Sequence, residues 1–462
     1  MGISLARPFK PKQNKKPQTD AQRPQDKPGF AARKVAADIL GNVVHKHRPL
    51  DGELELKSGH SGFRALEPKD RALVRAILGA ALRHRGEISE ILTRLLDRDI
   101  PEKTGRVLDI LHVAIAQMLY LDIPDRAAVS LAVDHASADS RSRVYKGLVN
   151  GVLRRLGRER DMMTEDLDGE VLNTPEWLFT RWVETYGEET ARKIAAAHQH
   201  EAALDISVKS NPKVWAERLE GVLLAGKTIR LSRKGAVDGL VGFEEGAWWV
   251  QDLAASLPAR LLGDVSGQTV ADLCAAPGGK TAQLAASSGK VTAVDISKGR
   301  LKRLSQNMDR LGLPVETVVA DLRKYDPPEL FDAILLDVPC SATGTIRRHP
   351  DVPWLKGERD IETLAEIQKE LLERVAGWLK PGGQMVYCTC SMERDEGEAQ
   401  IEAFLKAHLD FRLVPVAGDE IGGLNACISP EGYVRTLPFH SVDPNSELTG
   451  LDGFFAARLQ RS

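Results

Sequence analysis

The sequence has few cysteines and no long hydrophobic segment. Five cysteines occur among 462 residues, an odd number with none before residue 274. Their number and spacing exclude a disulfide framework and indicate a reducing compartment. No uncharged apolar run approaches the roughly 18 residues that span a bilayer, the longest candidate lying around residues 111–121. The N-terminus also lacks the apolar core of a signal peptide. We therefore expect a cytoplasmic protein with no membrane contact.

The chain also has almost no net charge, but the two signs are unevenly distributed. The formal net charge is −2. Residues 1–160 carry 30 Lys and Arg against 19 Asp and Glu, whereas the remainder carries 33 against 46. Such an asymmetry indicates an anionic partner for the basic part, often a nucleic acid, although a basic solvated face is the simpler alternative.

The patterns divide the chain into four segments. Residues 1–27 carry seven basic and two acidic residues among Pro and Gln, so we expect a disordered basic tail. Residues 28–160 show helical stripes, for example at 107–119 and 144–156, and predict an all-α domain. Residues 170–249, with one helical segment at 177–198 and short alternating runs, predict a small α+β connecting domain. In residues 250–462, apolar runs alternate with amphipathic stretches, including a helix over 371–379, and predict a parallel sheet covered by helices.

Basic residues cluster near the end of the predicted all-α domain, and they form either a phosphate-facing surface or the solvent-exposed face of its last helix. They are Arg141, Arg143, Lys146, Arg154, Arg155 and Arg158.

A glycine-containing turn follows the first predicted strand of the parallel sheet. Residues 270–281 read as a buried strand, a small-residue turn and a helix start, where glycine lets the backbone approach a ligand. A triphosphate-binding loop needs glycine at position 274, which is Cys274, and the G-x-G-x-x-G pattern is absent. The turn is nevertheless a candidate cofactor loop, with the candidate residues Cys274, Ala275, Ala276, Pro277, Gly278, Gly279 and Lys280.

Three further predicted strands, over 290–296, 315–321 and 331–337, end in or beside Asp295, Asp321 and Asp337. One acid at a strand end is commonly a helix cap, but three in series after a glycine loop indicate a binding site. An acid about twenty residues after the loop can accept hydrogen bonds from ribose hydroxyls. Three carboxylates would repel a polyphosphate, so we expect a nucleoside ligand with a cationic linkage, such as S-adenosylmethionine.

Two cysteines, Cys340 and Cys390, follow strands that end on the same edge of the sheet, whereas Cys388 lies inside a strand and is expected to be a core residue. A metal site is disfavoured because no His or Cys cluster completes the ligands. A thiolate, the Asp337 carboxyl and a methyl donor suit methylation of carbon 5 of a pyrimidine. The thiolate adds to carbon 6, Asp337 binds the Watson–Crick edge of the base, and a second group removes the carbon-5 proton.

Four segments of the second half, residues 272–281, 337–351, 387–391 and 452–459, resemble the Sun-family RNA cytosine-C5 methyltransferases. Residues 145–156 look like the NusB-type RNA-binding domain of the RsmB/Fmu branch of that family. The resemblance covers nearly all of the chain after residue 27. It implies an N-terminal all-α NusB-like domain, a small α+β linker domain and a C-terminal α/β Rossmann-like methyltransferase domain.

The resemblance also implies roles for individual residues. Cys390, in the Thr-Cys motif, would be the nucleophile, and Cys340, in the Pro-Cys motif, would assist proton removal and product release. Residues 274–280 with Asp295, Asp321 and Asp337 would line the S-adenosylmethionine site. The implied substrate is a cytosine of 16S rRNA, and we expect a monomer. Val338 and Gly397 depart from the alanine and asparagine usual in the family.

Two alternatives remain open from the sequence. The Pro-Cys placement of DNA cytosine methyltransferases would make Cys340 the nucleophile instead of Cys390. The NusB-like half alone would also suit a non-catalytic RNA-binding or antitermination factor. In the catalytic reading, Arg347 and Arg348 are expected to bring basic charge to the cleft.

Overall fold

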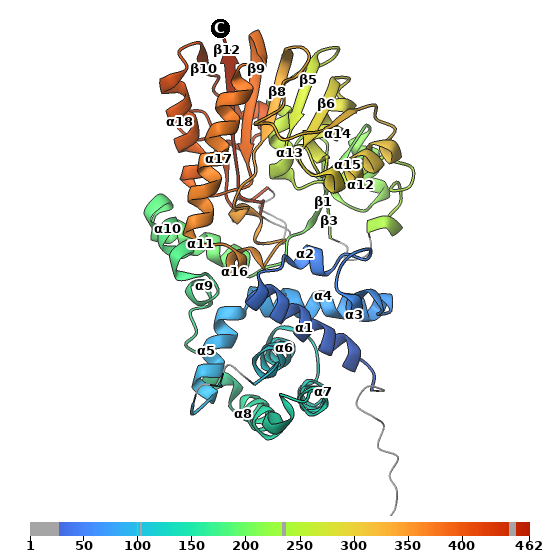
Figure 1. Cartoon of the computed structure of the whole chain (residues 1–462), viewed down its shortest axis with the longest axis vertical. Helices are drawn as coiled ribbons and strands as arrows, with labels where there is room; N and C mark the ends of the chain where they lie inside the picture. The colour runs from blue at the N-terminus through green and yellow to red at the C-terminus, as the bar shows by residue number, and fades with distance from the viewer. Residues whose placement is uncertain (1–26, 99, 102–103, 233–236, 443–449) are drawn as a thin grey trace, which may run out of the picture.

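The computed structural model describes residues 27–462 except 99, 102–103, 233–236 and 443–449. Residues 1–26 of the expected basic tail therefore lie outside the described residues. The described chain forms a helical part, a middle part and a large sheet-containing part, with the helical part below the sheet in Figure 1. The expected boundaries at residues 28–160, 170–249 and 250–462 stay predictions.

The helical part buries one continuous apolar core. Its long helices pack mainly through the pairs α7–α8, α1–α4 and α6–α7. α4 begins at Pro68, which is favourable at the first helical position because proline has no N–H to leave unpaired, and it buries Val74, Ile77 and Leu78. The helices are α1 (Phe30–Lys46), α2 (Leu50–Glu53), α3 (Ser61–Arg64), α4 (Pro68–Arg83), α5 (Arg85–Leu95), α6 (Val107–Tyr120), α7 (Asp125–Ala138), the short η2 (Arg143–Tyr145) and α8 (Lys146–Thr164).

In the described residues, the middle part combines four α-helices with an antiparallel sheet of strand order β2-β3-β1-β4. The single helix expected over 177–198 is wrong, because Gly187, with φ 81°, separates two helices there. The elements are α9 (Gly169–Leu172), α10 (Glu176–Tyr186), α11 (Glu188–His198), β1 (Leu204–Val208), α12 (Pro212–Arg218), β2 (Val222–Leu223), β3 (Thr228–Leu231), η3 (Val237–Gly239) and β4 (Trp248–Val250).

The C-terminal part is built on an eight-stranded sheet of order β10-β12-β9-β8-β5-β6-β7, with β11 paired to β12. Strands β5 to β9 are parallel, and β12 is antiparallel to β9. The strands are β5 (Thr269–Leu273), β6 (Lys290–Asp295), β7 (Glu316–Val319), β8 (Phe331–Asp337), β9 (Leu379–Thr389), β10 (Phe411–Leu413), β11 (Val434–Thr436) and β12 (Phe454–Arg461).

Helices cover both faces of this sheet (Figure 1). The helices of this part are α13 (Leu253–Arg260), α14 (Gly279–Ala286), α15 (Lys298–Leu311), α17 (Glu358–Ala376) and α18 (Glu398–Ala407), with the short helix α16 (Val352–Leu355) in the loop after β8 and short turns η4 (Thr343–Thr345), η5 (Arg394–Glu396), η6 (Gly418–Ile421) and η7 (Asn425–Cys427). The chain runs outward from β5 through β6 to β7 and then returns to β8 on the other side of β5. Open α/β sheets bind ligands outside the carboxyl ends of the strands at such a reversal, so the ends of β5 and β8 are the expected place for the site.

Three expected boundaries change. The helix expected over 371–379 ends at Ala376, because Leu379 pairs with Phe331 and already belongs to β9. The strand expected to reach residue 296 ends at Asp295, whose carboxylate accepts a hydrogen bond from the backbone of Ser297 and turns the chain. The strand expected to reach Asp321 ends at Val319.

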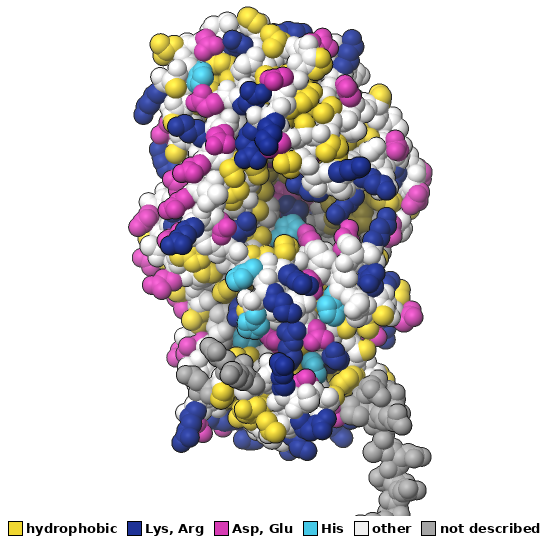
Figure 2. Space-filling view, viewed as in Figure 1, with side chains coloured by type: hydrophobic (Ala, Val, Ile, Leu, Met, Phe, Trp, Pro, Cys, Tyr) yellow, Lys and Arg dark blue, Asp and Glu magenta, His cyan; other side chains and the backbone are white. Residues whose placement is uncertain are grey.

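The loop after β8 joins the sheet to the helical part. Trp354 and Leu355 of α16 pack against the helical core. Trp354 Nε1 donates to the carbonyl of Leu82 (2.9 Å), and the backbone N of Leu50 donates to Asp351 Oδ2 (2.8 Å). Figure 1 shows α16 between the two parts, and Figure 2 shows a hollow between them.

Candidate active site

The carboxyl edge of the parallel strands gathers all the predicted site residues. Cys274 follows β5, Asp295 ends β6, Asp321 lies two residues after β7, Asp337 ends β8 and Cys390 follows β9. Parallel strands end at one edge, so residues far apart in sequence meet there.

The loop after β5 has the tight geometry expected of a cofactor loop. Cys274 has φ 59°, the Ala276–Pro277 peptide is cis, and Gly278 has φ 103°. A side chain at Gly278 would also come within 2.7 Å of Leu304, so the close packing and the positive φ both require glycine there. Behind the loop, Thr281 Oγ1 donates to the buried Asp272 (2.5 Å), which ties α14 to β5.

Asp295 and Asp321 differ in their surroundings. Asp295 is buried, and its two oxygens accept from the backbone N of Ala276 (3.1 Å) and of Ser297 (2.8 Å). It therefore holds the cofactor loop in shape, and each oxygen can accept one more hydrogen bond. Asp321 forms a two-pronged ion pair with Arg323 (3.0 and 2.8 Å), whose hydrogen bonds lower the pKa of Asp321 below its ordinary value.

Asp337 pairs with a buried lysine from the cofactor loop. Lys280 Nζ donates to Asp337 Oδ2 (2.8 Å) and lies 4.7 Å from the centre of the Phe454 ring. Burial opposes the charge on Lys280, but the charge of Asp337, the nearby thiols and this hydrogen bond outweigh it and raise the pKa of Lys280 above its ordinary value. Lys280 is thus a fixed cation beside the two cysteines.

The two predicted catalytic cysteines are in direct contact. Cys340 Sγ and Cys390 Sγ lie 3.3 Å apart, and neither thiol is in a disulfide. The hydrogen bond between the two thiols, together with burial, raises the pKa of the Cys390 thiol well above its ordinary value. Cys390 is therefore protonated before substrate arrives. Cys388 is buried in β9 as expected, and its thiol also contacts Asp337 Oδ1 at 3.6 Å.

The expectation for Arg347 is wrong, because its side chain is buried and donates to the carbonyl of Leu451 (3.1 Å). Arg348 is partly exposed but forms an ion pair with the buried Asp452. The basic motif after the Pro-Cys loop therefore serves mainly to tie that loop to the segment before β12.

Sequence reasoning missed a buried acid behind the cysteines. Glu396 is fully buried and accepts from the backbone N of Ser341, the residue after Cys340 (2.9 Å). The only sequence signal was its neighbour Gly397, which departs from the family pattern. A side chain at Gly397 would come within 2.7 Å of Arg435 and 3.0 Å of Phe455, so the tight packing explains the glycine. Val338 fits into the apolar core behind Asp337.

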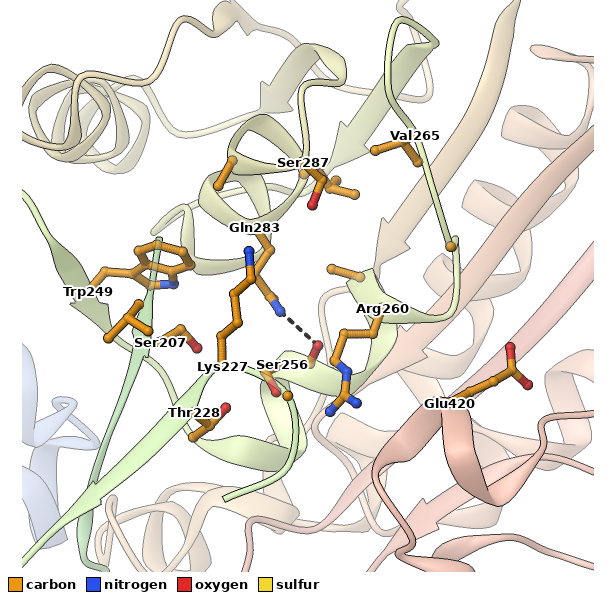
Figure 3. A pocket seen from close by; sticks show the side chains of 16 residues that line it. Ser207, Lys227, Thr228, Trp249, Ser256, Arg260, Val265, Gln283, Ser287 and Glu420 are labelled. Atoms are coloured by element: carbon orange, nitrogen blue, oxygen red, sulfur yellow. Dashed lines mark hydrogen bonds between the residues drawn. The ribbon is translucent and has the colours of Figure 1, made fainter. Parts of the chain in front are cut away.

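A cavity of about 410 Å³ lies away from this edge, between the antiparallel sheet and helices α13 and α14 (Figure 3). Lys227, Trp249, Arg260 and Gln283 are among its walls. No predicted site residue is among the described residues that line it, so it is separate from the candidate active site.

The described residues contain no group of three or more His, Cys, Asp or Glu side chains that could hold a metal ion. In the same part of the chain, no helix has the length and apolar character needed to cross a bilayer.

Two family models match the chain: 16S rRNA methyltransferase RsmB/F over residues 259–460 and the NusB family over residues 31–158. The ribosomal RNA small subunit methyltransferase B of Erwinia tasmaniensis is 34% identical over 449 residues, which cover 92% of this chain and 98% of that protein. The Klebsiella pneumoniae protein of the same name is 36% identical over 82% of this chain and 91% of its own. The crystal structure of PH0851 has a TM-score of 0.72 at 25% identity and covers 94% of this chain and 99% of its own.

The Rossmann-like sheet, the cofactor loop and the matching families define an S-adenosylmethionine-dependent methyltransferase joined to a NusB-type helical domain. The two domain types and their order confirm the fold class expected from the sequence. More particularly, the chain belongs to the RsmB/F family of 16S rRNA methyltransferases. The non-catalytic alternative is therefore wrong.

Proposed function

We propose that the chain methylates carbon 5 of a cytosine in 16S rRNA and that Cys390 is the nucleophile. The observation that carries this proposal is the pair of thiols, 3.3 Å apart, beside the Lys280–Asp337 ion pair on the edge that holds the cofactor loop. Few reactions need two thiols, a carboxylate and a methyl donor at one place. Methylation of an unreactive pyrimidine carbon does, because it needs covalent activation.

The residues present suit S-adenosylmethionine, which supplies an electrophilic methyl group when bound. The backbone of residues 274–280 and the start of α14 would hold the amino-acid end, where helix N–H groups favour a carboxylate. Asp295 would bind the ribose, and Asp321 would lie at the outer end of the site. The acids Asp295, Asp321 and Asp337 suit a cationic sulfonium and disfavour a polyphosphate.

The remaining steps fall to the chain's own side chains. Cys390 Sγ releases its proton to solvent, and the resulting thiolate forms a bond to carbon 6, which makes carbon 5 nucleophilic. Asp337, with Lys280 beside it, binds the Watson–Crick edge and stabilises the charge that develops on the ring. After carbon 5 is methylated, Cys340 accepts the carbon-5 proton, the bond between Cys390 and carbon 6 breaks, and the aromatic ring is restored.

Trapping of the covalent RNA adduct tests this assignment. With substrate RNA and S-adenosylmethionine, Cys340→Ala is expected to accumulate a protein–RNA adduct, because addition still occurs and release does not. Cys390→Ala is expected to form none. Denaturing gel electrophoresis with labelled RNA measures both, and the reverse pattern would make Cys340 the nucleophile.

We also propose that the protein acts as a monomer in the cytoplasm, where small-subunit rRNA is available to it. Mapping of 5-methylcytosine in 16S rRNA from cells with and without the gene identifies the target nucleotide. An unchanged map would contradict the proposed substrate.

A further inference from the structure

A fully buried polar network brackets both cysteines. At its centre, Glu396 Oε1 accepts from the backbone N of Ser341 (2.9 Å) and from Gln368 Nε2 (2.9 Å), and Oε2 accepts from the Ser341 hydroxyl. Gln368 Nε2 also donates to the carbonyl of Pro339 (2.9 Å). Pro339 and Ser341 are the two neighbours of Cys340, so Glu396 and Gln368 together hold the backbone on both sides of that cysteine.

The same network reaches the other thiol. The Ser341 hydroxyl lies 3.1 Å from the hydroxyl of Ser391, the residue after Cys390. The Tyr387 hydroxyl donates to the carbonyl of Glu396 (2.7 Å) and also lies 3.3 Å from Gln368 Oε1. All five side chains, those of Ser341, Gln368, Tyr387, Ser391 and Glu396, have no exposed surface.

A buried acid held in this way has a strong effect on local geometry. A carboxylate out of water is costly unless donors surround it, and Glu396 has three. If one partner is lost, the remaining buried groups stay unsatisfied, so the network has one satisfied arrangement and resists others. The hydrogen bonds that the Glu396 carboxylate makes in the described structure go to Ser341 and to Gln368, and none goes to residues 274–280.

We propose that Glu396 is a positioning residue for the second half of the reaction: it holds the Cys340 thiol where it can take the carbon-5 proton. This inference rests on the proposed role of Cys340. It predicts that loss of the Glu396 carboxylate slows proton removal and adduct release more than adduct formation, because Cys390 is held only indirectly, through Ser391.

The test uses the full-length Glu396→Gln variant, which keeps the size of the side chain but replaces one acceptor oxygen with a donor group. With substrate RNA and S-adenosylmethionine, we expect turnover to fall about tenfold to a hundredfold, the usual effect of a shift of about 1 Å in a reacting group. The steady-state fraction of covalent adduct should rise severalfold over wild type. The affinity for S-adenosylmethionine, measured by calorimetry, should not change.

Glu393→Gln is the matched control. Glu393 is a buried acid in the same segment, but its side chain pairs with Arg181 (2.9 Å) and Trp182 (3.2 Å) and contacts neither neighbour of Cys340. Glu393→Gln should show wild-type adduct levels even if the variant is less stable than wild type. Ser341→Ala, which removes only a hydroxyl, is the milder second variant if Glu396→Gln fails to fold, and it should shift adduct levels in the same direction.

Wild-type turnover in Glu396→Gln, or lower turnover without an adduct increase in both Glu396→Gln and Ser341→Ala, would overturn the inference while leaving the cysteine roles intact. If Cys340→Ala itself accumulates no adduct, the proposed function fails instead. The two failures are therefore distinguishable in one set of reactions.

Discussion

Asp272, the fourth residue of β5, is an acidic residue whose pKa is shifted mainly by burial. It is almost fully buried and accepts from Thr281. Burial, together with the charges of Asp337 and Asp295, raises the pKa of Asp272 to about 7. The folded protein therefore keeps a proton on this group between about pH 4 and 7, where the unfolded chain releases it. Stability is full at low pH and falls as the pH rises through that window.

Asp272→Asn removes this titration while it keeps an oxygen for Thr281. Between pH 5 and 7.5, wild type is expected to lose about 2 kcal/mol of unfolding free energy that the variant does not lose. Urea denaturation of both proteins at several pH values measures the difference, in which other titrating groups cancel. Parallel stability curves would show that Asp272 ionises normally in the folded protein.

At the scale of elements, the four-residue helix α16 joins the loop after β8 to the helical part. It follows the loop that begins at Cys340, and its Trp354 contacts the helical part through Leu82 and through Arg85, whose guanidinium lies 5.5 Å from the ring centre. Arg83 Nη2 also donates to the carbonyl of Arg347 in the same loop (2.9 Å). The loop is thus held from the sheet on one side and from the helical part on the other.

Trp354→Ala is expected to lower the unfolding free energy by about 2 to 3 kcal/mol, the lower range for loss of a large aromatic side chain, since Trp354 is only partly buried. Trp354→Phe keeps most of the packing and loses the hydrogen bond to Leu82, so about 1 kcal/mol is expected. Calorimetric unfolding of the full chain measures both. Equal effects of the two variants would mean that the hydrogen bond, rather than the packing, joins the parts.

At the scale of the whole molecule, the first 160 residues and the remainder of the chain carry net charges of opposite sign. The basic excess falls in the first 160 residues, whereas the catalytic edge contains four carboxylates, Asp272, Asp295, Asp321 and Asp337. In Figure 2, Lys and Arg side chains lie on the helical part and beside the hollow, and also over the sheet-containing part. A groove of about 680 Å³ between α7 and α8 is lined by Arg126, Arg154 and Arg158 among others. We therefore predict that the chain contacts RNA mainly through the helical part.

Arg154→Ala with Arg158→Ala is therefore expected to weaken RNA binding and to reduce the slope of log affinity against log salt by about 1.5, the value for two lost phosphate contacts. The exposed residues Lys369 and Lys406, on α17 and α18 of the sheet-containing part, provide a control with the same loss of charge. Filter binding over a range of salt concentrations measures the slopes. Equal effects of the two double variants would mean that the main RNA-binding surface does not include Arg154 and Arg158.

The sequence by itself determined the order and type of the domains, the tight loop after β5 and the strand-end residues. These features depend on short-range patterns. The spacing of hydrophobic residues predicts each helix or strand, and glycine marks the tight loop. Parallel strands then end at one edge of the sheet. The positions of Asp295, Asp337, Cys340 and Cys390 followed from this rule without any knowledge of their contacts.

Only the tertiary structure decided which side chains touch. The contact of the two thiols, the hydrogen bond between Glu396 and Ser341 and the hydrogen bond from Arg347 to Leu451 join residues 50 or more positions apart. The break at Gly187 and the start of β9 at Leu379, inside the helix expected over 371–379, likewise depend on how neighbouring segments pack and pair. Sequence patterns record which surface of an element is apolar, but the partner that covers it is chosen by packing across the whole chain.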